Sequence, residues 1–193
     1  MLKIVAGTSG LLSQVVAVAA LVFVLTKSPW FRWLEHNLSI LGVEGSARVL
    51  FNVGIGIAGI LGIVFALGLR DSIVSGGSVG WVGIVSLALG SAALAVIGLV
   101  PRTTALPHNI ATVAFFVLIT LAVCLVGVQF LLEGRLVGGI LSIAAVVFII
   151  GFQVVPWPAE GGAIPQLLSC VPWSAWTLVF AVRLLAGGLQ GGA

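Results

Sequence analysis

The sequence predicts an all-α, polytopic membrane protein built from six transmembrane helices. Of the 193 residues, 61% are hydrophobic and only 7% are charged, whereas soluble domains carry roughly 45–50% apolar and about 25% charged residues. Apolar runs of about 20 residues, the length that crosses a bilayer core of roughly 30 Å, recur six times. So few charges cannot cover a soluble surface. Soluble enzymes, disordered tails and nucleic-acid-binding proteins are therefore excluded.

The predicted helices follow one another along a single domain, residues 1–193. The first apolar run is bounded by Lys3 and Lys27 and is too long for a signal peptide, so we expect a retained helix. The next four runs contain no charge, and the last contains only Arg183. The expected helices are residues 4–26, 49–69, 80–100, 110–132, 136–155 and 171–188.

The connections between these helices differ in length on the two sides of the membrane. Short connections, at residues 70–77 and 133–135, follow the second and fourth helices. Longer ones, at residues 27–48, 101–109 and 156–170, lie on the opposite side, which we call the long-loop face. An even number of helices places both termini on the other side, which we call the terminal face.

Two short segments resemble each other. Residues 34–38 (LEHNL) and residues 106–110 (LPHNI) share Leu, His and Asn, and each precedes an even-numbered helix. The repeat favours an arrangement of three tandem helical hairpins, and chance similarity is an equally good explanation.

Lysine and arginine do not orient the helices, because they divide equally between the two faces. Tryptophan is uneven, with only Trp81 on the terminal face. Interfacial tryptophan normally anchors a helix at headgroup depth, so we interpret the others as anchors. A stacking surface for a lipid or a partner is the alternative. The tryptophans of the long-loop face are Trp30, Trp33, Trp157, Trp173 and Trp176.

Small residues recur every four positions in the second predicted helix, at Gly54, Ala58 and Gly62. Lipid gives helices no hydrophobic reason to associate, and small residues allow their backbones to approach closely. We therefore predict that these three residues pack against another helix.

Polar side chains that could perform chemistry gather on the long-loop face. His36 and His108 both precede even-numbered helices, so we expect them to meet in one polar cluster, closed by an ion pair such as Glu44 with Arg102. The alternative is structural, with Asn37 and Asn109 capping helix starts. The candidate cluster comprises Glu35, His36, Asn37, Ser39, Glu44, Arg48, Asn52, Arg102, His108 and Asn109.

These residue types indicate no particular reaction. A hydrolase would need Ser39 activated by a histidine, and no nucleophile-elbow sequence accompanies it. A metal site needs three or four ligands, and the histidines lack helical spacing, so we expect no metal and no cofactor. The helix centres hold only neutral polar groups such as Ser13, Gln14 and Thr120, which argues against ion-coupled transport.

Several short motifs resemble the family called domain of unknown function 998. They are residues 37–42 (NLSILG), followed by Phe51-Asn52 and Gly54, and residues 98–101 (GLVP), followed by His108. The resemblance implies the six-helix fold and carries no established activity. Family members commonly have Asp where Ile40 stands, and an acidic-Arg or Gln-Arg pair where this chain has Gln166-Leu167. We expect no chemistry here that depends on those charges.

Two classes of function fit the sequence. The first is an integral membrane protein without catalytic machinery, acting as an accessory or scaffold subunit of a membrane complex. The alternative is an intramembrane enzyme or lipid-binding protein with a polar site on the long-loop face. The expected partners are membrane lipid and other membrane subunits, with no nucleic acid. The expected location is the cell membrane of a prokaryote.

Overall fold

The described part of the chain forms six α-helices and one short 3₁₀ helix. The computed structural model describes residues 2–73, 77–100, 102–158 and 161–187. Each α-helix is long and apolar enough to cross a membrane, which confirms the predicted all-α, six-helix membrane fold. The elements are α1 (Leu2–Thr26), η1 (Leu38–Gly42), α2 (Arg48–Ile73), α3 (Ser78–Leu99), α4 (Ala105–Leu132), α5 (Leu136–Val154) and α6 (Ala163–Leu185).

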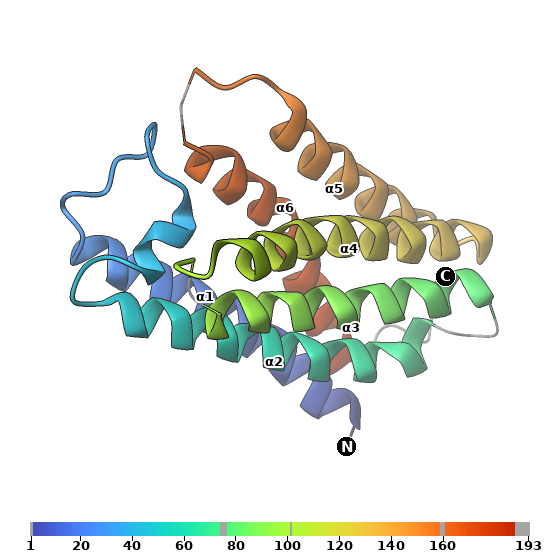
Figure 1. The fold of residues 1–193 in the computed structure, drawn as a ribbon. Helices are drawn as coiled ribbons and strands as arrows, with labels where there is room; N and C mark the ends of the chain where they lie inside the picture. Colours follow the sequence, from blue (N-terminus) through green and yellow to red (C-terminus); the bar gives the residue numbers. More distant parts are fainter. Residues whose placement is uncertain (1, 74–76, 101, 159–160, 188–193) are drawn as a thin grey trace.

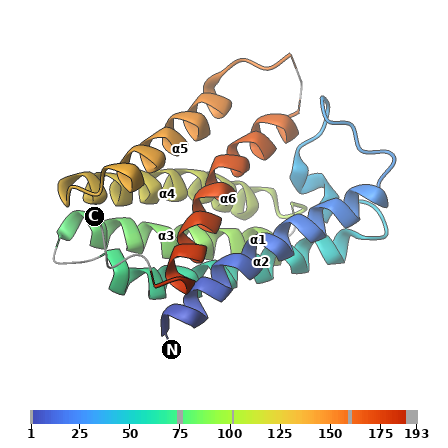
Figure 2. The same cartoon turned by 180° about the vertical axis from the view of Figure 1, so that it is seen from behind.

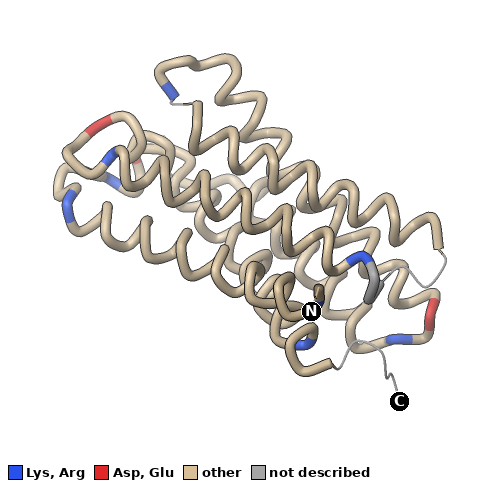
Figure 3. The backbone as a smooth tube through the Cα atoms, turned by 90° about the horizontal axis from the view of Figure 1, so that it is seen from below, with Lys and Arg blue, Asp and Glu red and all other residues tan. Residues whose placement is uncertain are grey.

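The charged residues that the structure describes lie near the two ends of the bundle and leave its middle without charge (Figure 3). This distribution is typical of helices that cross the hydrocarbon core of a bilayer. α1 begins where α6 ends, because Gly7 of α1 lies against Ala181 and Leu185 of α6. The outer ends of the first and last helices therefore share the terminal face, as predicted.

The helices form a ring in chain order. Each helix packs against the next, and α6 closes the ring against α1 (Figures 1 and 2). Contacts are most extensive from α1 through α4 and sparser around α5 and α6. Because neighbours pack across short and long connections alike, the ring does not separate three hairpins. The tandem repeat stays a prediction.

Small residues set the spacing between α2 and its two neighbours. A Cβ added at Gly54 would overlap Ala20 of α1, and one added at Gly62 would lie 2.7 Å from Ser91 Oγ of α3. Ala58, between these glycines, is buried. The predicted packing of this stripe is confirmed, and its glycines contact two partner helices rather than one.

α4 begins at Ala105, earlier than the predicted start near residue 110. Its third residue is Pro107. The first four N–H groups of a helix have no partner within the helix, so a proline there costs no hydrogen bond. Taking Asn109 as the cap of an apolar run that begins at residue 110 places the start too late. Asn109 therefore lies inside α4 and is exposed, and its predicted role as the cap of this helix is wrong.

α6 begins at Ala163, well before the predicted start near residue 171. Pro165 is its third residue and is tolerated in the first turn for the same reason. The helix also continues through Pro172. The long connection predicted over residues 156–170 is thus mostly helical, while the predicted end at residue 188 lies outside the described residues.

Trp173 and Trp176 lie in the core of the bundle, not at its surface. Trp176 is 4% exposed. The two indole rings stack with centroids 5.7 Å apart, and Phe180 lies 4.5 Å from Trp176. The Trp176 indole N–H donates to Ser142 Oγ of α5 at 2.9 Å. The interpretation of both tryptophans as interfacial anchors is wrong, because the earlier start of α6 moves them to the middle of a helix.

α5 and α6 lean away from the other helices toward the long-loop face (Figure 1). At the terminal face, Gly7 of α1 meets Ala181 of α6, and a Cβ added at Gly127 of α4 would lie 2.7 Å from Ser142 Cβ of α5. Small residues permit this close approach. Nearer the long-loop face, openings lie beside α1 and beside α4.

Candidate functional site

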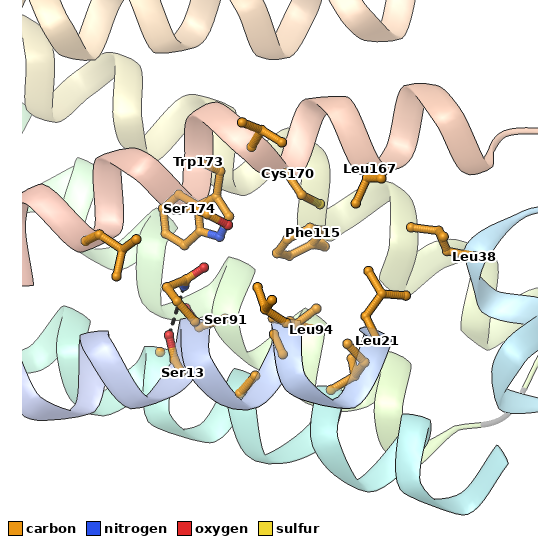
Figure 4. A pocket seen from close by; sticks show the side chains of 18 of the residues that line it. Ser13, Leu21, Leu38, Ser91, Leu94, Phe115, Leu167, Cys170, Trp173 and Ser174 are labelled. Carbon is orange, nitrogen blue, oxygen red and sulfur yellow. Dashed lines mark hydrogen bonds between the residues drawn. The ribbon is translucent and has the colours of Figure 1, made fainter. Parts of the chain in front are cut away.

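A cavity of about 420 Å³ lies between α1 and α6 in the wider half of the bundle. We call it the α1–α6 cavity. η1, α2, α3 and α4 complete its wall. It has a polar inner end, near the middle of the helices, and an apolar outer end toward the long-loop face. Figure 4 shows Ser13, Ser91, Trp173 and Ser174 at the inner end, and Leu21, Leu38 and Leu167 at the outer end.

The α1–α6 cavity opens sideways, through the gap between its two named helices. Val18 of α1 and Val171 of α6 line the cavity and are exposed on the outside of the bundle. Both residues belong to the central parts of membrane-spanning helices. The opening therefore faces the hydrocarbon of the bilayer rather than water.

A second, more open groove of about 630 Å³ lies between α4 and α5. Its polar side chains already have partners within the protein. The Thr112 and Thr120 hydroxyls donate to carbonyls of the preceding turn of α4, at 2.9 and 2.6 Å. The Gln153 amide donates to Ser169 Oγ at 3.0 Å. This groove therefore offers few free polar groups to a ligand.

Asn37, one of the predicted site residues, holds the beginning of α6. Its Oδ1 accepts a hydrogen bond from Gly162 N at 2.7 Å, and Leu38 N donates to Gln166 Oε1 at 3.0 Å. The N–H groups of residues 161 and 163 also donate to carbonyls of the loop between α1 and α2. We call these four bonds the α6 clasp. The Asn37 side chain thus satisfies one backbone N–H group at the start of α6, that of Gly162, and it does not cap η1.

Replacing Asn37 by alanine is expected to loosen the α6 clasp and to lower the free energy of unfolding by about 1–2 kcal/mol. Hydrogen exchange of residues 161–166 in detergent should become faster, because Gly162 N loses its acceptor. Asn109→Ala removes an exposed amide from α4 and should change neither quantity. Equal exchange in the two variants would show that Asn37 does not hold α6.

Glu35 and His36 organise the loop between α1 and α2. His36 Nδ1 accepts a hydrogen bond from Arg32 N at 3.1 Å. Its ring lies beside Trp30 and Phe31, with centroids 5.7 and 5.6 Å away. Glu35 forms an exposed ion pair with Arg32 at 3.1 Å, a type of pair that contributes little to stability.

Asn52 and Arg48 connect α2 to the turn that precedes it. Asn52 Nδ2 donates to Gly42 O at 2.9 Å, and the Arg48 guanidinium donates to Val43 O at 3.5 Å. Ser39 is half-buried in η1, and Glu44 is exposed in the turn. Asn52 and Arg48 thus fix the turn onto α2.

His108 is buried at the start of α4 and is 3% exposed. Its Nδ1 lies 2.8 Å from Val100 O, which can only accept a hydrogen bond. Nδ1 is therefore the donor in this hydrogen bond. Among the described residues, Nε2 has no hydrogen-bond partner. The ring thus joins α4 to the end of α3.

The expected ion pair between Glu44 and Arg102 is not formed in the part of the chain that the structure describes. The ion pairs there join near neighbours in the sequence, such as Arg32 with Glu35. Glu44 is exposed, so water solvates its carboxylate without a partner. A site shared by His36 and His108 stays a prediction.

The cavity and the predicted polar cluster are different places. All ten cluster residues are described, and none of them lines the α1–α6 cavity or the groove beside α4. The polar side chains that do line the cavity include Gln14, Ser91 and Ser174. One sequence signal could have found them, because Gln14 is a polar residue at the centre of a transmembrane helix, and such residues are often functional.

No three His, Cys, Asp or Glu side chains in the described ranges form a group that could hold a metal ion.

Comparison with known proteins gives one match. No curated protein and no solved structure matches the chain. The sequence profile of one family, Protein of unknown function (DUF998), matches residues 11–183, which span all six helices at least in part. The chain therefore belongs to the DUF998 family.

Proposed function

We propose that the protein binds the hydrocarbon chain of a membrane lipid in the α1–α6 cavity. One observation carries this proposal, namely a cavity of about 420 Å³ that lies within the membrane-spanning part of the bundle and opens toward lipid. Binding pockets for small molecules typically measure about 300–1,000 Å³ and are mostly apolar. The cavity has this size and this lining.

The walls of the cavity support a chain as the occupant. Leu21, Phe51 and Leu167 line its outer part, and the exposed Val18 and Val171 stand at its opening. A chain from the bilayer could enter sideways without crossing a polar surface. Filling the space would restore the close contacts that neighbouring side chains lose beside an empty volume.

Ala17 faces the cavity from α1, so replacing it by phenylalanine should fill part of the space and block a chain. We expect labelling of α1 and α6 by a hexadecane that carries a mid-chain diazirine to fall about 10-fold in vesicles, which corresponds to about 1.4 kcal/mol of binding free energy. Mass spectrometry of the labelled peptides gives the measurement.

Ala19→Phe supplies the matched control. Ala19 lies two positions along α1, is exposed and does not line the cavity, so the same enlargement there should leave the labelling unchanged. If both variants label like the unmodified protein, no chain occupies the cavity. That result would favour the accessory or scaffold subunit instead.

A further inference from the structure

The inner end of the α1–α6 cavity places polar groups where the bilayer is most apolar. Gln14 stands at the centre of α1, and Ser91 and Ser174 lie in the middle parts of α3 and α6. The Trp173 indole joins them at the same end (Figure 4). The other lining residues are apolar, and they surround these polar groups as well as forming the outer end. The exceptions are Ser13 and Cys170.

Most of these polar groups lack a hydrogen-bond partner within the protein. The side chain of Gln14 is 9% exposed, and its Nε2 donates to Ser13 Oγ at 2.9 Å, the dashed line in Figure 4. Among the described residues, no hydrogen bond reaches Gln14 Oε1, the hydroxyls of Ser91 and Ser174, or the indole N–H of Trp173. Unpartnered polar groups are costly at this depth, because hydrocarbon supplies no partner.

The charge of the lining restricts the occupant. No Asp, Glu, Lys, Arg or His is among the residues that line the cavity. An ionised or zwitterionic headgroup at the inner end would therefore be buried without a counter-charge, which is strongly unfavourable. The group that enters must be neutral.

The free atoms of Gln14 select among neutral groups. Its Oε1 requires a donor, while its second Nε2 hydrogen and the Trp173 N–H require acceptors. A ketone or ester only accepts and would leave Oε1 unpartnered. A hydroxyl donates and accepts, so it satisfies both kinds of group at once.

We infer that the occupant is a neutral lipid ending in a hydroxyl group, which inserts that group first, to the middle of the membrane. The inference rests on the proposed function and adds the headgroup and the direction of entry. The chain then extends along Leu21 and Leu167 to Leu38 at the outer end. The orientation of such a lipid is the reverse of that of a phospholipid in the leaflet at the long-loop face, because its polar group lies at the middle of the membrane and its chain points outward.

Three probes of equal chain length test the headgroup in vesicles. They are hexadecane, hexadecanol and ionised palmitate, each with a mid-chain diazirine. Hexadecanol should label the cavity about 10-fold more than hexadecane at equal subsaturating concentration, as expected for about 1.4 kcal/mol of hydrogen bonding. Palmitate should label it least. In Gln14→Leu, the preference for hexadecanol over hexadecane should disappear.

The direction of entry has its own readout. A diazirine beside the hydroxyl should label peptides around Ser13 and Ser174, whereas one at the far end of the chain should label residues near Leu38. The reversed pattern overturns the inference, and so does equal labelling by hexadecanol and hexadecane in the unmodified protein. If none of the three probes labels the cavity of the unmodified protein, the proposed function is overturned instead. If Gln14→Leu does not fold, the probe comparisons on the unmodified protein still decide.

Discussion

Replacing Gly98 by valine is expected to prevent stable folding. Gly98 of α3 lies against the backbone of α2, and a Cβ added there would overlap Gly56 N and Asn52 O and lie 2.7 Å from Gly56 Cα. Backbone atoms of a helix cannot move aside as the end of a side chain can. We expect a loss of about 3 kcal/mol or more, the upper end of the range for overpacked interiors. Size-exclusion yield and thermal unfolding in detergent measure the effect.

Gly151→Val is the matched control for this prediction. Gly151 also lies in a transmembrane helix, α5, and a Cβ added there meets no atom within 4 Å. The same change of helix propensity should therefore cost less than about 1 kcal/mol. Similar folded yields for the two variants would mean that α2 and α3 do not approach as closely as described.

Truncating Trp176 to alanine is expected to have the largest effect among the tryptophans. The substitution removes a buried ring that stacks on Trp173 and packs against Phe180, and it leaves Ser142 Oγ without its indole donor. Truncation of a buried aromatic residue typically costs about 3–5 kcal/mol. The free energy of unfolding in mixed detergent micelles should fall by an amount of this order.

Trp33→Ala tests whether position in the fold decides the effect. From the sequence alone, Trp33 and Trp176 belong to the same face and have the same expected role. Trp33 is 38% exposed in the structure, whereas Trp176 is buried. We expect Trp33→Ala to cost below about 1 kcal/mol. Equal losses in the two variants would contradict the buried position of Trp176.

The motifs that carry the family resemblance build the scaffold. Asn37 joins the α6 clasp, and Asn52 ties α2 to η1 through Gly42 O. Gly98, in the second motif, packs on the α2 backbone at Asn52, so the two motifs meet. Substitutions there should change folding first. Substitutions that test function should be made at Gln14 and the residues beside it in the cavity.

The sequence by itself determined the fold class and the helices. Runs of apolar residues between charges are a local signal, because each helix must span the bilayer and satisfy its own backbone. The same reasoning predicted the close packing of Gly54 and Gly62. It placed the starts of α4 and α6 too late, because the first turns, which contain Pro107 and Pro165, precede the apolar runs that marked the helices.

Only the tertiary structure decided where a ligand could bind. Small residues hold α1 and α6 together at the terminal face, and the α1–α6 cavity lies beyond that contact, where the two helices diverge (Figure 2). Its polar end joins Gln14, Ser91 and Ser174 from three helices, and no spacing along the chain relates them. A side chain at the centre of an apolar helix can face lipid, a neighbour or a cavity. How the helices cross decides which of these three the side chain faces. The crossing itself depends on contacts between residues far apart in the sequence.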